Sequence, residues 1–138
     1  MTVTSTYKQA NLFAGALDAD DFQAVEALLS KNCVFIGRGK IIEGRAAIIN
    51  SYRESSERAQ ELFDAVHYES DVLSSSETSA EILFADYLTC GKLSHIYRSR
   101  HFLEFSTDGP IIRIRQEEEA GEVLNLKNFM QECEITDE

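Results

Sequence analysis

Two side chains suited to proton transfer, Asp86 and His101, lie on neighbouring runs of alternating apolar and polar residues. A carboxylate and an imidazole are groups that general acid–base catalysis uses. An aspartate can orient a histidine and raise its basicity, and imidazole exchanges protons near neutral pH. We therefore predict that His101 and Asp86 form a catalytic pair. In it, His101 is the proton shuttle and Asp86 is its orienter or a second acid–base group.

The elements that must position this pair are strands at 79–90 and 93–105, where the residue pattern has a period of two. Gly91-Lys92 between them is a two-residue hairpin turn, which pairs residue 90 with residue 93. In this register Asp86 lies opposite Tyr97 and Ile82 lies opposite His101. Since side chains alternate across a sheet, these residues share one face.

Two more strands are expected at 65–73 and 111–119, and all four pair antiparallel in sequence order because tight turns join them. Charged residues on 93–105 and 111–119 occupy one face, which is therefore the outer one. On 111–119 the inner face is expected to carry Ile112, Ile114, Gln116 and Glu118. Together with interior residues of the helices and other strands, this alternation predicts a ligand-binding set: Phe13, Tyr52, Phe84, Tyr97, Ser99, Gln116 and Glu118.

The same residues also have a purely structural interpretation. An inward histidine is more often a pocket-lining or core residue than a catalyst, and Asp86 could serve only to bond Tyr97. Tyr52 could be a core aromatic, and Glu118 lies near a strand end where solvent exposure is usual. Both interpretations stay open from the sequence.

The segments before the strands show helical spacing of apolar residues. A helix is predicted at 5–16 with Ser5 as its N-cap, and a second follows with Asp18 or Asp20 as its N-cap. A short buried strand at 33–36 precedes a long helix from about 45 to 63. Residues 122–132 fit a short helix or a strand extension.

Composition excludes several functions. The chain has 138 residues and a net charge of −11, which disfavours nucleic acids and anionic membranes as partners. Its three cysteines are widely spaced, which is typical of reduced thiols and favours the cytoplasm. No phosphate-binding glycine motif and no tight histidine spacing is present, so we expect no cofactor and no metal. We expect one domain over 1–138.

The order of these elements resembles the nuclear transport factor 2-like superfamily, which includes ketosteroid isomerases and polyketide cyclases. Three segments carry the resemblance, over about residues 5–120: FAGALDADDFQAV at 13–25, CVFI at 33–36 and IEGRAAI at 42–48. It implies an α+β fold, in which a strongly curved antiparallel sheet forms a cone-like half barrel closed by three N-terminal helices. It also implies an internal pocket and a homodimer through the outer sheet face.

The catalytic residues of ketosteroid isomerases are not matched. Ile36 or Gly37 stands at the first-strand aspartate, Phe13 at the first-helix tyrosine and His101 at the third-strand aspartate. Arg98 and Arg100 fall on the outer face, so the Asp-Arg-Asp set of related epoxide hydrolases is not evident either. Two functions remain open. One is a cofactor-free isomerase, cyclase or dehydratase that transfers a proton on a small apolar ligand. The other is a non-catalytic ligand-binding or dimeric protein-association domain.

Overall fold

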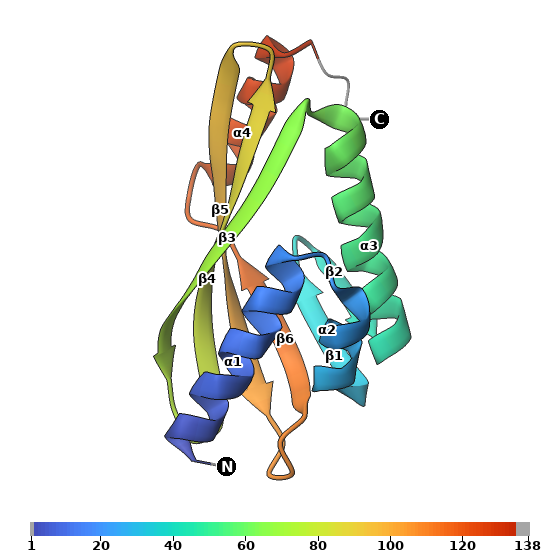
Figure 1. The fold of residues 1–138 in the computed structure, drawn as a ribbon, viewed down its shortest axis with the longest axis vertical. Coiled ribbons are helices and arrows are strands. Elements are labelled where there is room, and N and C mark those ends of the chain that lie inside the picture. The colour runs from blue at the N-terminus through green and yellow to red at the C-terminus, as the bar shows by residue number, and fades with distance from the viewer. Residues whose placement is uncertain (1, 135–138) are drawn as a thin grey trace.

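The computed structural model describes residues 2–134, in which four helices accompany one six-stranded sheet (Figure 1). Residue 1 and residues 135–138 of the predicted 1–138 domain lie outside this range. The helices are α1 (Val3–Asp18), α2 (Phe22–Leu28), α3 (Arg45–Leu62) and α4 (Glu122–Glu132). The strands are β1 (Leu29–Gly37), β2 (Lys40–Glu43), β3 (Ala65–Ser75), β4 (Ser79–Cys90), β5 (Leu93–Phe105) and β6 (Ile111–Glu117).

The N-caps of the first two helices differ from those predicted. Thr2 caps α1, because its side chain accepts a 3.0 Å hydrogen bond from the backbone N–H of Ser5, which lies within the first turn. The helix extends to Asp18, so the cap of α2 moves along the chain to Asp21, which accepts from the N–H of Ala24. Neither Asp18 nor Asp20 is a cap, and both carboxylates are available for other contacts.

The strand order is β2-β1-β6-β5-β4-β3. The predicted antiparallel pairing of β3 to β6 in sequence order is confirmed, as is the register of Asp86 with Tyr97 and of Ile82 with His101. The strand predicted at 33–36 is longer and pairs with β6 in parallel. The short strand β2 was not predicted; it forms a hairpin with β1.

One expectation for the inner face of β6 is wrong. Ile112 is 40% exposed, whereas Ile111 is fully buried. The register between β5 and β6 shifts after Glu104, so that Phe105 lies opposite Ile111. Such an irregularity changes the face to which a neighbouring side chain points. Ile114 is buried as expected.

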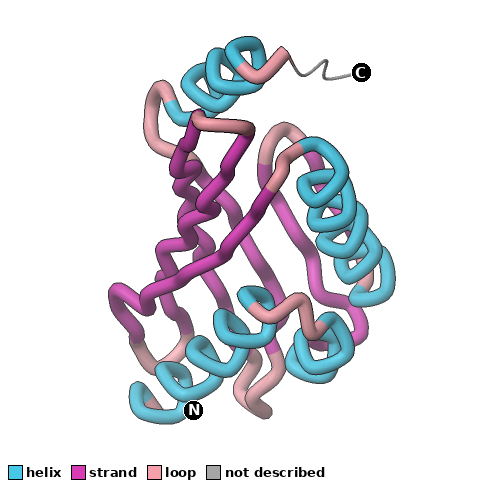
Figure 2. The backbone as a smooth tube through the Cα atoms, turned by 45° about the horizontal axis from the view of Figure 1, so that its top comes forward, coloured by secondary structure: helices cyan, strands magenta, loops and turns pink. Residues whose placement is uncertain are grey.

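The helices α1, α2 and α3 cover the inner face of the curved sheet, and α4 lies near the β4–β5 hairpin (Figure 1). Figure 2 shows the first three helices on one side of the strands. The structure confirms the predicted α+β class and the cone-like sheet. Residues 122–132 form a helix, which resolves the alternative left open for them.

The core consists of two hydrophobic clusters. The larger one joins α1, α2 and α3 to the sheet and includes Phe13, Ile48, Ile82 and Leu103. The smaller one lies where α4 packs, and its buried members are Phe63, Leu88, Tyr97, Phe129 and Met130. Cys33, Cys90 and Cys133 are free thiols. Within residues 2–134, no helix combines the length and the apolar character that crossing a membrane requires.

Candidate functional site

A cavity of about 210 Å³ lies between the helices and the inner face of β3, β4 and β5, where the two hydrophobic clusters meet. Typical sites for small ligands have roughly 300–1,000 Å³, so this cavity fits a compact molecule. Seven of the nine predicted site residues line it: Tyr52, Phe84, Asp86, Tyr97, Ser99, His101 and Gln116.

The other two predicted residues, Phe13 and Glu118, lie outside the cavity lining and contact residues that form it. Phe13 is fully buried, and its ring centroid lies 6.4 Å from that of His101. Glu118 accepts a 2.8 Å hydrogen bond from the hydroxyl of Tyr97 and another of 2.8 Å from the side-chain amide of Gln116. Both residues therefore hold lining side chains in place, and neither lines the cavity itself.

His101 lies in an aromatic box. Its ring packs edge-to-face on Phe84, with centroids 4.6 Å apart, and stacks on Tyr52 at 6.2 Å. The residue is 5% exposed, and neither ring nitrogen has a hydrogen-bond partner among the described residues. Burial lowers the pKa of His101 to about 3, because the charged imidazolium is poorly solvated there. The imidazole is therefore neutral near pH 7, and one nitrogen can donate while the other accepts.

Asp86 lies on the same strand pair, where its register partners are Tyr68 on β3 and Tyr97 on β5. Burial, together with the nearby carboxylates of Asp18 and Asp20, raises the pKa of Asp86 to about 7. Asp86 is thus the group in this cavity that exchanges protons near neutrality.

Of the two roles predicted for Asp86, that of orienting His101 would need a hydrogen bond between them, and the described residues show none. His101 has no hydrogen bond to any described residue, and its register partner is Ile82, four residues from Asp86. The two groups line one cavity on the same face of the sheet, but they are offset by four residues along the paired strands β4 and β5. Of the two groups, Asp86 has the pKa closer to neutrality, and the buried imidazole of His101 is neutral near pH 7.

Two further carboxylates, from the end of α1 and from the α1–α2 connection, line the cavity and were not predicted as site residues. Asp18 accepts a hydrogen bond from the Ser70 hydroxyl, and its other carboxylate oxygen is buried without a partner; burial raises its pKa. Asp20 accepts from Ser56 at 2.7 Å and from Gln60 at 3.2 Å. The sequence does contain a signal for these two site residues. A helix N-cap needs one aspartate, whereas residues 18–21 contain three, which leaves two for another role.

Arg38 and Tyr68 also line the cavity and were not predicted. Arg38 comes from the β1–β2 turn, and its guanidinium carbon lies 6.0 Å from the ring centroid of Tyr97. Tyr68 comes from β3, and its hydroxyl is 3.3 Å from that of Ser56. The turn around Arg38 gave no sign that its side chain would fold back over the sheet.

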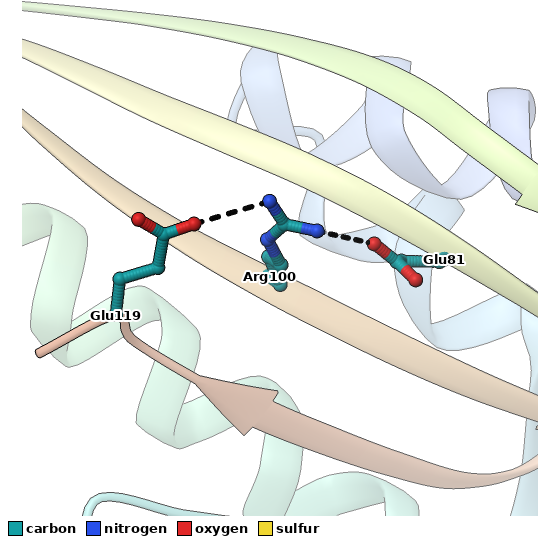
Figure 3. A network of polar contacts seen from close by, with 3 residues as sticks. All are labelled: Glu81, Arg100 and Glu119. Carbon is teal, nitrogen blue, oxygen red and sulfur yellow. Dashed lines mark hydrogen bonds and ion pairs between the residues drawn. The ribbon is translucent and has the colours of Figure 1, made fainter.

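The outer face of the sheet is charged, as predicted. Arg100 forms ion pairs with Glu81 at 2.7 Å and with Glu119 at 3.2 Å, and Figure 3 shows this network on the side of the strands away from the helices. Arg98 is exposed. Neither residue lines the cavity, so the Asp-Arg-Asp set of the epoxide hydrolases is not formed with them.

Comparisons with known proteins decide the fold. No family model matches the chain, and no curated protein matches it. Among solved structures, an epoxide hydrolase of M. tuberculosis described as LEH-like is similar with a TM-score of 0.68 and 19% identity, over 95% of this chain and 92% of that one. A nuclear transport factor 2-like protein of unknown function from Cytophaga hutchinsonii is similar with a TM-score of 0.61 and 16% identity, over 81% and 88%. The chain has the nuclear transport factor 2-like fold.

A third example is a candidate polyketide cyclase from Pseudomonas putida, which has a TM-score of 0.65 and 18% identity over 91% of this chain and 97% of that one. The predicted resemblance to the nuclear transport factor 2-like fold is thereby confirmed. At these identities the similarity establishes the architecture, and a given fold hosts many different activities. The chemistry must therefore be argued from the cavity.

Proposed function

We propose that this nuclear transport factor 2-like chain binds a small, largely apolar molecule in its cavity and transfers a proton on it without a cofactor. An isomerase, cyclase or dehydratase would all use such a step. The observation that supports this most is Asp86, a carboxyl group that lines the cavity and has a pKa of about 7. A general base works best when its pKa is near the operating pH.

In the proposed step, the Asp86 carboxylate takes a proton from a carbon next to a substrate carbonyl. The electron pair of the broken C–H bond moves to the carbonyl oxygen, and Asp86 then returns the proton to the same or another carbon. A neutral donor lies in the same cavity for the developing oxyanion, the imidazole N–H of His101. It is unpartnered, so a substrate oxygen would satisfy a buried group that otherwise costs free energy.

This step differs from that of the ketosteroid isomerases in the position of the base. At the end of the first strand, a Cβ added to Gly37 would come within 2.8 Å of the Cβ of Gln116. A carboxylate therefore has no space there without movement of β6. The base proposed here comes from β4, on the opposite side of His101's strand from β6.

Proton transfer can be tested without knowing the substrate. The full chain is incubated in D2O with a panel of small ketones, and deuterium entry at the carbon next to the carbonyl is followed by NMR. We expect exchange that Asp86→Asn abolishes and that Asp71→Asn, a matched change at an exposed position of β3, leaves unchanged. Exchange that persists in Asp86→Asn would contradict the assignment.

The alternative is a cavity that binds a ligand without chemistry. It predicts ligand-induced chemical shifts at Ser99 and His101 with no deuterium exchange for any bound ketone. The proposal also retains a homodimer through the outer sheet face and a location in the cytoplasm, which the free thiols support.

A further inference from the structure

A second cavity, of about 380 Å³, adjoins the first. Four residues line both: Arg38, Tyr52, Ser55 and Gln116. Lys40 of the β1–β2 hairpin and Ser51 of α3 both line the second cavity, which therefore lies between these two elements. One elongated molecule could therefore occupy both spaces, with its two ends in different surroundings.

The sign of the charge reverses between the two cavities. The charged residues that line the second one are Arg38, Lys40 and Arg58, and no described Asp or Glu lines it. In a chain with 24 acidic and 13 basic residues this segregation is unexpected. The first cavity is lined mainly by acidic groups, because Asp18, Asp20 and Asp86 line it beside the shared Arg38. Clefts lined by charges of one sign concentrate ligands of the other sign.

The backbone of Arg38 has an unusual, left-handed conformation. Arg38 and Gly39 form the two-residue turn between the paired residues Gly37 and Lys40, with φ values of 50° and 75°. This left-handed conformation favours Gly, Asn and Asp, and it is unfavourable for a long side chain. An arginine here lowers stability, and such outliers concentrate where a side chain has a function.

Tyr52 lies at the wall that the two cavities share. Its hydroxyl is buried, has no hydrogen-bond partner and belongs to a side chain that lines both cavities. Burial raises the pKa of this hydroxyl well above its usual range, so it remains a proton donor at every physiological pH. The hydroxyls of Ser51 and Ser55 add further donors to the second cavity. Hydrogen-bond donors and cations together are what an oxyanion requires.

We propose that the second cavity binds the oxyanion group, a carboxylate or a phosphate, of a substrate whose apolar body lies in the first cavity beside Asp86. This inference rests on the proposed function and narrows its substrate class from apolar molecules to small organic acids. Arg38 and Lys40 hold the anion, and Tyr52 at the shared wall donates to it. The anion is thereby kept away from the three carboxylates of the first cavity.

The probes for this proposal are benzoate, phenyl phosphate and the neutral analogue benzamide, titrated into the full chain and followed by NMR. We expect at least one anion to bind at least tenfold more tightly than benzamide and to lose affinity as salt is raised. Tighter binding of benzoate assigns the site to carboxylates, and tighter binding of phenyl phosphate assigns it to phosphates. Equal binding of all three, or no binding, would overturn the proposal.

The key variant is Arg38→Asn, because asparagine tolerates the left-handed turn and the protein should fold at least as well. We expect its melting temperature to stay the same or rise while its affinity for the anion falls at least tenfold. Lys40→Gln should weaken binding to a smaller extent. Arg113→Gln, on an outer strand face where Arg113 is about half exposed, is the matched control and should change nothing. Unchanged anion affinity in Arg38→Asn contradicts the proposal.

This test is separate from that of proton transfer. Asp86→Asn removes the base but leaves the second cavity intact, so anion binding should persist in it. If ketones exchange deuterium but Arg38→Asn binds anions normally, the anion site fails and proton transfer stands. If anion binding depends on Arg38 but no ketone exchanges deuterium, proton transfer fails and the anion site stands.

Discussion

Asp86 and Tyr97 are direct partners in the β4–β5 register, and both side chains line one cavity. Their polar groups nevertheless differ in hydrogen bonding. The Tyr97 hydroxyl donates a 2.8 Å hydrogen bond to Glu118, whereas Asp86 has no hydrogen bond to a described residue. The tyrosine is thus committed to the structure, and the carboxyl group beside it remains available to a ligand.

Asp86 should make stability fall as the pH rises from about 4 to about 7. Its folded-state pKa of about 7 lies above the usual 3.8, so its favourable contribution is complete below pH 3.8 and is lost as the pH rises through 7. At pH 8, Asp86→Asn should therefore raise the free energy of unfolding, by about 2–4 kcal/mol at one unit of pKa shift per 1.4 kcal/mol. At pH 4 the gain should nearly vanish.

Denaturant unfolding of both proteins at pH 4, 6 and 8 measures this difference. Asp71→Asn serves as the control, because Asp71 is exposed on β3. A gain that is the same at every pH would contradict the raised pKa.

His101 should change stability with pH in the opposite direction from Asp86. Its folded-state pKa of about 3 lies below the usual 6.5, so the unfolded chain takes up a proton first and stability falls as the pH drops below 6.5. His101→Phe keeps a ring in the aromatic box and removes two unpartnered nitrogens. At pH 5 it should be more stable than the parent by about 2 kcal/mol. Thermal unfolding at pH 5 and 7 would show the gain; a loss of stability at both values would count against a neutral buried imidazole.

The hydrogen bond between Tyr97 and Glu118 should be worth measuring in a double-mutant cycle. Tyr97→Phe should cost about 1–3 kcal/mol, because a charged acceptor loses its donor in a partly buried position. Glu118→Gln in the Tyr97→Phe background should cost less than it does alone. Fully additive effects of the two changes would show that the contact contributes nothing.

Dimerisation through the outer face is open to a direct check. Tyr87 lies on β4 on the face opposite Asp86 and is 36% exposed. We expect the parent chain to sediment as a dimer and Tyr87→Arg to shift it toward the monomer, because two added charges would meet at a symmetric interface. Sedimentation of the parent as a monomer at high concentration would exclude this dimer.

Much of the sheet could be predicted because its signals are local. The Gly91-Lys92 turn alone sets the register that brings Asp86 opposite Tyr97, and that register is confirmed. The parallel pairing of β1 with β6 has no local signal, since it joins strands far apart in the sequence. The exposure of Ile112 depends on an irregularity next to Glu104 that alternation cannot reveal.

The site was only partly predictable for the same reason. Residues on regular strands, such as Ser99 and Gln116, were placed correctly in the cavity by counting along the strand. Asp18, Asp20 and Arg38 come from a helix end and two connections, where no period indicates direction. The opposite pKa shifts of Asp86 and His101 follow from burial, which a sequence pattern does not quantify.

The pKa of Asp86 in the unliganded chain is the most direct test of the account. Aspartate carboxyl carbons labelled with 13C can be titrated by NMR, and the Asp86 signal is assigned by its loss in Asp86→Asn. The account predicts a midpoint near pH 7 for this signal, well above the usual aspartate value of 3.8. A midpoint near pH 4 would show that Asp86 is an ordinary solvated carboxylate and would remove the proposed base.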